Sequence, residues 1–122
     1  MEKLEKLKMS LKNGNKNMEY EIVISDTCIE EIEENCNYIE KVLKAEQASN
    51  RVREKIRETI RGLKNSPKIY AKIEKTDRAG RDYRRIVIDN YVIIYTIVEE
   101  DKTILISHMY YGGRNYLEGG LL

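Results

Sequence analysis

The sequence contains no tryptophan or phenylalanine, and it has one proline and one histidine among 122 residues. Nine tyrosines therefore supply all of the aromatic surface. No apolar run approaches the ~18 residues that a membrane-spanning helix needs. The sequence also lacks a basic stretch followed by an apolar core, which is the pattern that would indicate secretion. These absences predict a soluble, cytoplasmic protein that makes no contact with a membrane.

Cysteine is also scarce, and Cys28 and Cys36 are the only two. They lie eight positions apart in a helical pattern, which places their Cα atoms roughly 12 Å apart at ~1.5 Å per residue. A disulfide needs less than ~7 Å, so the helix excludes an intrachain bridge. One histidine and no C-x-x-C pair speak against a zinc site. We expect no metal and no cofactor.

The charged residues are segregated along the chain. A composition of 41% hydrophobic and 35% charged residues is typical of one globular domain. The net charge of +1 divides into +3 for residues 1–17, −7 for 18–50, +8 for 51–85 and −3 for 86–122. The basic third could meet a polyanion or an acidic protein partner, or it could be a solvated helix face with its loop.

Apolar periodicity predicts two helices after a first strand at residues 20–25. Thr27 opens an S/T-x-x-E capping box, and the apolar stripe of the first helix extends to Leu43 between glutamates. The second helix has an apolar stripe from Ala45 to Leu63 with basic flanks, and it ends before Pro67. Opposite charges on neighbouring helices suit an antiparallel hairpin.

The rest of the chain predicts a meander. Residues 68–82 form a polar, lysine-rich connection, and strands then begin at Tyr83, Tyr91 and Thr103. Asp89 and Asn90 form the first tight turn, too short for a parallel crossover. The predicted fold class is α+β, a helix hairpin packed on a four-stranded, mainly antiparallel sheet in the order β-α-α-β-β-β.

Alternation also predicts how the sheet is covered. Both faces of residues 91–98 are apolar, so this strand is central, with the helices on one face and the other left for a ligand or partner. Arg84 and Arg85 are adjacent and therefore point to opposite faces. We expect the helix-side arginine to pair with a helix glutamate.

Two segments, "YRRIVIDNYVIIYTI" and "ILISHMYYGGRNYLEGGLL", resemble the second half of RelE/ParE-superfamily toxins of bacterial type II toxin–antitoxin modules. The preceding run of Ala48, Ile60, Leu63, Pro67 and Tyr70 matches as well. The similarity spans residues 18–122 and leaves 1–17 as an N-terminal extension, helical or disordered. It implies a cognate antitoxin as partner, and a homodimer or a toxin–antitoxin heterotetramer as the assembly.

The resemblance implies two targets. RelE-like toxins are endoribonucleases, mRNA interferases that arrest growth by cleaving messenger RNA on the ribosome, whereas ParE-like toxins inhibit DNA gyrase without nuclease activity. A degenerate, non-toxic antitoxin-binding module is a further alternative. Clustering of His108, Arg114 and several tyrosines beside two glycines favours cleavage. The strand has Arg84 and Ile86 at the positions where RelE-like toxins carry the two lysines of Lys-x-Lys, and residues 18–122 carry a net charge of −2. Both departures weaken the nuclease interpretation without removing it. The predicted function is therefore translation inhibition by ribosome-dependent mRNA cleavage, with gyrase inhibition and the non-toxic module as alternatives.

Metal-free RNA cleavage by 2′-hydroxyl attack needs a base, an acid and cations around one phosphate. Arg84 and Arg114 could supply the cations, His108 the proton transfer, and Tyr116 stacking or a proton relay. The residues predicted to bind RNA or another target are Arg85, Tyr91, Tyr111, Lys72, Lys75, Arg78 and Arg81. Packing offers structural roles for two of these residues as alternatives to catalysis or binding. Strand alternation groups His108 with Ile104 and Ile106, and Tyr91 could fill the core.

Overall fold

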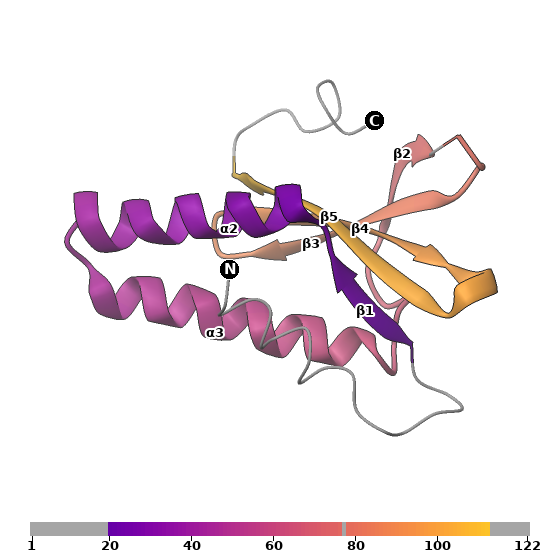
Figure 1. Ribbon diagram of the computed structural model, residues 1–122, viewed down its shortest axis with the longest axis horizontal. Helices are drawn as coiled ribbons and strands as arrows, with labels where there is room; N and C mark the ends of the chain where they lie inside the picture. Colours follow the sequence, from indigo (N-terminus) through magenta and orange to yellow (C-terminus); the bar gives the residue numbers. More distant parts are fainter. Residues whose placement is uncertain (1–19, 77, 113–122) are drawn as a thin grey trace.

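The computed structural model describes residues 20–76 and 78–112, so the predicted extension at 1–17 and the candidate residues Arg114 and Tyr116 lie outside the described part of the chain. Figure 1 shows the elements, which in chain order are β1 (Glu21–Ile24), α2 (Asp26–Asn37), the π-helical turn η1 (Tyr38–Val42), α3 (Glu46–Leu63), β2 (Lys72–Thr76), β3 (Asp82–Ile88), β4 (Tyr91–Val98), the 3₁₀ turn η2 (Glu99–Asp101) and β5 (Thr103–Tyr111).

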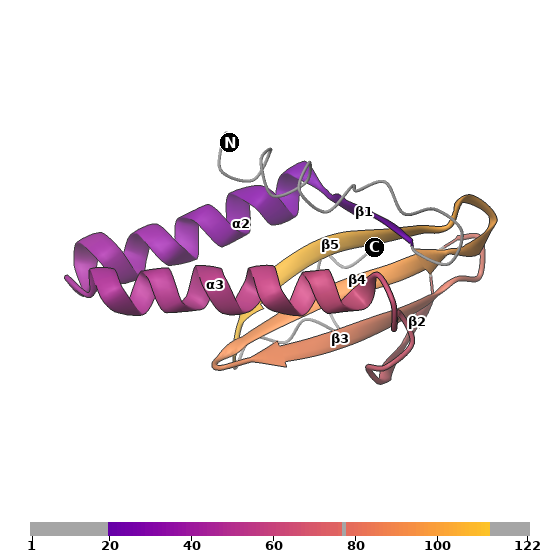
Figure 2. The ribbon, with the colours of Figure 1, turned by 90° about the horizontal axis from the view of Figure 1, so that it is seen from below.

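The strands form one five-stranded sheet in the order β1-β5-β4-β3-β2. β1 pairs with β5 in parallel, and the other three pairings are antiparallel. Both helices lie against one face of this sheet (Figures 1 and 2). The α+β helix-hairpin fold, the central position of β4 and the antiparallel β3–β4 turn are therefore confirmed.

The prediction of four strands is wrong because the expected connection at 68–82 contains β2. This edge strand, KIEKT, has only Ile73 as an apolar residue. It pairs irregularly with β3, through Lys72 with Arg84 and Thr76 with Asp82. Charged side chains are a common way to protect an exposed sheet edge, and they also conceal the strand from a search for alternating apolar residues.

The N-terminal cap of the first helix lies two residues before the predicted one, Thr27. Ser25, in extended conformation, caps α2 by accepting a hydrogen bond at Oγ from the Cys28 N–H at 3.0 Å. The same hydroxyl donates to the carbonyl of Ser107 in β5 at 2.8 Å. Thr27 is therefore not the cap, because Ser25 satisfies the helix end and also ties it to the sheet.

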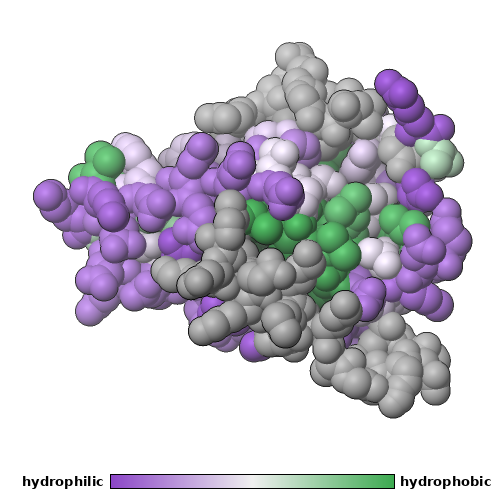
Figure 3. All heavy atoms as spheres, viewed as in Figure 1, coloured by the Kyte–Doolittle hydropathy of each residue, from purple (hydrophilic) through white to green (hydrophobic). Residues whose placement is uncertain are grey.

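The end of the helix hairpin departs from the predicted pattern at Leu43. The backbone hydrogen bonds of the π-helical turn η1 span five residues instead of four, as from the Leu43 N–H to the Tyr38 carbonyl at 3.1 Å, and this shifts the apolar stripe around the axis. Ile39 remains buried, whereas Val42 and Leu43 are 61% and 56% exposed. This end lies at the left of Figure 1, and Figure 3 shows an apolar area there.

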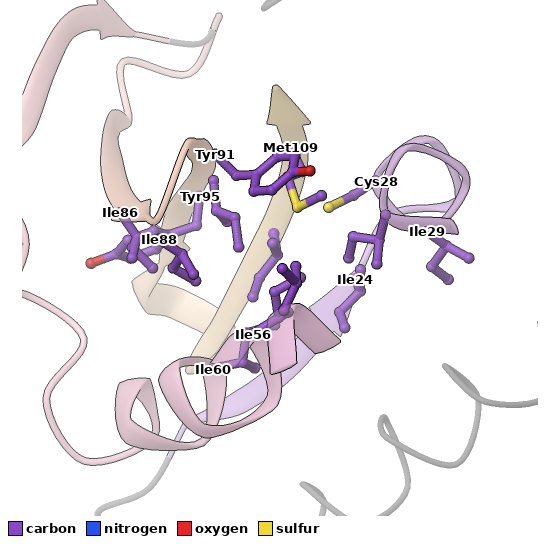
Figure 4. Close-up of a cluster of buried hydrophobic side chains, with 14 of the residues drawn as sticks. Ile24, Cys28, Ile29, Ile56, Ile60, Ile86, Ile88, Tyr91, Tyr95 and Met109 are labelled. Atoms are coloured by element: carbon purple, nitrogen blue, oxygen red, sulfur yellow. The ribbon is translucent and has the colours of Figure 1, made fainter. Parts of the chain in front are cut away.

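The main core lies between the helix hairpin and the sheet. Figure 4 shows Ile56 and Ile60 of α3 facing Tyr95 and other sheet residues, with Cys28 close to Met109 of β5. Both cysteines are buried thiols. A smaller cluster of Ile73, Tyr83, Val92 and Ile94 occupies the opposite face, which we call the outer face of the sheet. The two apolar faces of β4 thus enter two different clusters, as predicted.

Candidate functional site

Arg84 and Arg85 point to opposite faces of the sheet, as predicted. Arg84 is in phase with the core residue Ile86 and lies on the helix side, whereas Arg85 is exposed on the outer face. Arg84 donates from Nη1 to the carbonyl of Tyr70 at 2.6 Å and to that of Lys68 at 3.4 Å. The expected pairing with a helix glutamate is wrong, because backbone carbonyls of the α3–β2 connection take its place.

His108 lies on the outer face because β5 contains a β-bulge. The register with β4 passes from Tyr95–Ile106 to Ile94–His108, which leaves Ser107 as an extra residue. The predicted grouping of His108 with Ile106 on one face is therefore wrong. The imidazole stacks on the Tyr110 ring, with centroids 5.2 Å apart.

Glu31 of α2 holds the end of β5 with both carboxylate oxygens. Oε1 accepts the Met109 N–H at 2.8 Å, and Oε2 lies 3.4 Å from the Nδ1 of His108. β1 pairs with β5 only as far as Ile106. Glu31 therefore satisfies an edge N–H that has no neighbouring strand.

Replacing Glu31 with alanine is expected to reduce the free energy of unfolding by about 1–3 kcal/mol, because the Met109 N–H loses its acceptor. Hydrogen exchange at the Met109 amide should accelerate in the same variant. Glu30→Ala, an exposed neighbour on the same helix, is the matched control and should change stability by no more than about 0.5 kcal/mol. Urea unfolding followed by circular dichroism gives the stability. Equal losses in both variants would contradict the clamp.

A charged pocket of about 280 Å³ lies on the helix side, beyond the C-terminal end of α3. Its lining contains three of the predicted site residues, Lys72, Arg81 and Arg84. The remaining lining residues, which the sequence did not single out, are Lys68, Gly80, Asp82, Ile97, Glu99 and Glu100. Ion pairs cross the rim, namely Lys72–Asp82 at 3.1 Å, Arg81–Glu100 at 2.7 Å and Lys68–Glu99 at 3.5 Å.

The other predicted site residues are dispersed. Tyr91 is 7% exposed in the main core, and burial raises the pKa of its hydroxyl. Tyr111 is 53% exposed and contacts Tyr91 edge to face at 5.6 Å. Arg78 is exposed in the β2–β3 connection, and Lys75 belongs to β2. The core interpretation of Tyr91 is thus confirmed.

The outer face of the sheet brings together a different set of side chains from those that line the pocket. Arg85, Ile94 and His108 are consecutive partners across β3, β4 and β5. At a strand spacing of ~4.8 Å, the backbones of Arg85 and His108 are about 10 Å apart. Tyr83 and Tyr110 flank this row on the same face. Sequence reasoning missed Glu31 because a glutamate on an acidic helix has no signal that distinguishes it from its neighbours.

Within 20–76 and 78–112, no group of three histidine, cysteine or carboxylate side chains could hold a metal ion. None of the helices in that part of the chain is long and apolar enough to cross a membrane.

The fold places the chain in a class of proteins that pack a helix hairpin on a five-stranded sheet. Here a charged pocket lies on one side of the sheet and a His–Tyr stack lies on the other. The family model for the ParE toxin of the type II toxin–antitoxin system parDE matches residues 22–116. The chain therefore belongs to the ParE toxin family, and the predicted membership of the RelE/ParE superfamily is confirmed.

Among solved structures, the chain is similar to the archaeal RelE–RelB complex from Pyrococcus horikoshii OT3. The identity is 18%, the match covers 80% of this chain and 100% of that one, and the TM-score is 0.48. No curated protein sequence matches this chain.

Proposed function

We propose that this ParE-family toxin inhibits DNA gyrase without cleaving RNA. The observation that carries the proposal is that Arg84 and His108 lie on opposite faces of the sheet. Metal-free cleavage needs its proton-transfer group and its cations around one phosphate. Two side chains separated by the sheet cannot meet there, so the predicted catalytic set does not assemble from its described members.

Electrostatics support the same proposal. Glu31 lies beside His108 and places a carboxylate where an RNA phosphate would approach. Residues 18–122 carry a net charge of −2, whereas a ribosome-directed nuclease benefits from a broadly positive field. A toxin that acts by contacting a protein target does not need such a field.

One observation favours ribosome-dependent mRNA cleavage as a second candidate. The row of Arg85, Ile94 and His108 places a cation and an imidazole on one face, beside the ring of Tyr110. In this alternative Arg85, rather than Arg84, stabilises the phosphorane charge. Arg85→Ala and His108→Gln would then each lower cleavage by roughly 10²-fold or more.

The test compares both activities of one purified preparation. We expect the chain to abolish supercoiling by gyrase and to leave the message intact in a translation reaction with purified ribosomes. Cleaved message with intact supercoiling would overturn the proposal and establish the second candidate. If neither assay responds and expression leaves bacterial growth unaffected, the chain is a degenerate antitoxin-binding module.

The partner that we propose is a cognate antitoxin, as expected for the toxin of a type II module. It would dock a helix or a strand over helix and sheet surfaces together. The solved relative from Pyrococcus horikoshii is itself a RelE–RelB complex. A cytoplasmic location and a homodimer or toxin–antitoxin heterotetramer belong to the same proposal.

A further inference from the structure

The charged pocket beyond α3 contains a cation that is already oriented. Arg84 uses Nη1 to donate to the carbonyls of Tyr70 and Lys68, and its side chain also lines the pocket. These bonds fix the plane of the guanidinium without neutralising it, because carbonyls are uncharged. An arginine that is held in place loses little conformational freedom when a carboxylate binds to its remaining donors.

The lysines of the pocket form ion pairs in which an incoming anion can replace the present carboxylate. The Lys68–Glu99 and Lys72–Asp82 ion pairs join side chains that are 48% to 65% exposed. Exposed ion pairs contribute only about 0–1 kcal/mol. An incoming anion can therefore take over one or both lysines at little cost. Asp82 then returns to water, while Glu99 keeps the hydrogen bond that it accepts from the Tyr20 hydroxyl at 3.0 Å.

The acidic residues of the rim decide which anion fits. Four basic side chains line the pocket with three acidic ones, namely Asp82, Glu99 and Glu100. A phosphate chain would bring several negative charges close to these carboxylates and be repelled. A single carboxylate on an aliphatic stem brings one charge for Arg84 and methylene groups for Ile97.

We propose that this pocket receives a glutamate or aspartate side chain from an acidic segment of a protein partner. The carboxylate binds Arg84 and displaces Asp82 from Lys72. In naming that partner as the antitoxin, the proposal rests on the proposed function. The pocket lies on the opposite side of the sheet from the His108–Tyr110 stack, so its occupant does not need to cover the outer face.

The test uses the full chain, labelled with ¹⁵N, and a capped hexaglutamate peptide as the probe. We expect amide shifts confined to the pocket, at Gly80, Arg81, Glu99 and Glu100. Lys72→Glu should weaken binding about tenfold, since it removes a charge-assisted hydrogen bond. Asp82→Asn should strengthen binding, because it removes the internal competitor for Lys72.

The matched control is Lys55→Glu, which makes the same charge change at an exposed lysine paired with Asp89 at the β3–β4 turn. It should leave peptide affinity within about twofold of the parent, because screening weakens interactions between distant exposed charges. Equal weakening by Lys55→Glu and Lys72→Glu would show non-specific attraction and overturn the proposal. So would weaker binding in Asp82→Asn, or the absence of pocket shifts.

Inorganic phosphate and a short oligonucleotide, titrated separately, distinguish the remaining sources of negative charge. Pocket shifts with either of these but not with hexaglutamate would overturn the choice of a peptide carboxylate. Peptide binding is measured without gyrase or ribosomes. Failure of the gyrase assay therefore leaves this result standing, and failure here leaves the proposed function untouched.

Discussion

Tyr95→Ala is expected to leave the domain largely unfolded at room temperature. The ring is fully buried in the main core, and its hydroxyl donates to the Pro67 carbonyl at 2.6 Å. Removing a buried aromatic ring costs about 3–5 kcal/mol, and the carbonyl left without a donor adds about 1–3 kcal/mol. Those losses are comparable with the whole stability of a small domain, about 5–15 kcal/mol.

Tyr95→Phe separates the two contributions, because it keeps the ring and removes only the hydroxyl. We expect a loss of about 1–3 kcal/mol, measured by urea unfolding. Tyr111→Phe, at a half-exposed tyrosine, is the control and should be nearly neutral. If Tyr95→Phe were as stable as the parent, the bond to Pro67 would make no net contribution.

Tyr95 also predicts a dependence on alkaline pH. Burial raises the pKa of its hydroxyl from 10.0 to about 12, although the nearby positive charge of Arg84 lowers it. In the unfolded chain the hydroxyl ionises near pH 10 while in the folded chain it stays neutral, so unfolding releases a proton in this range. The stabilisation is therefore present below pH 10 and is lost as the pH rises towards 12. Tyr95→Phe should lose less stability than the parent over this interval.

The second large effect is a contrast between two adjacent arginines. Arg84→Ala should lower the free energy of unfolding by about 2–3 kcal/mol, because the carbonyls of Tyr70 and Lys68 lose a charged donor. Arg85→Ala, at an exposed position one residue away, should change it by no more than about 0.5 kcal/mol. Urea midpoints of the two variants provide the comparison, and similar losses would contradict the assignment of faces.

The Arg84 and Tyr95 variants should also interact. Both side chains hold carbonyls of the α3–β2 connection, at Pro67, Lys68 and Tyr70. If this segment is released as a unit, the double variant with Tyr95→Phe loses less stability than the two single losses added together. Strict additivity would mean that the two side chains hold the connection independently.

The sequence predicts the fold best where apolar residues are dense. The expected strands at 91–98 and 103–111 have the same bounds as β4 and β5, because β-branched and aromatic residues fill both segments. The sequence did not predict β2, because the stability of this strand depends on pairing with β3 and not on its own side chains. The parallel pairing of β1 with β5 likewise depends on tertiary structure, and no local sequence pattern predicts it.

The candidate site is less predictable, for a physical reason. The opposite directions of Arg84 and Arg85 follow from alternation alone and are confirmed. The face of His108 depends on one unpaired residue in β5, and no local signal in "ISHMYY" identifies it. The pocket is assembled from four separate segments, so the grouping of Lys68 with Glu99 could not be read from sequence spacing.

The bulge at Ser107 has a consequence for how this family can diversify. Deleting one codon there would remove the bulge and make His108 the residue after Ile106, so His108 would stay on the outer face and the ladder with β4 would become regular. A relative without the bulge therefore reaches the same face one position earlier along its sequence. Comparisons among relatives that allow only substitutions will align outward residues of one protein with inward residues of another.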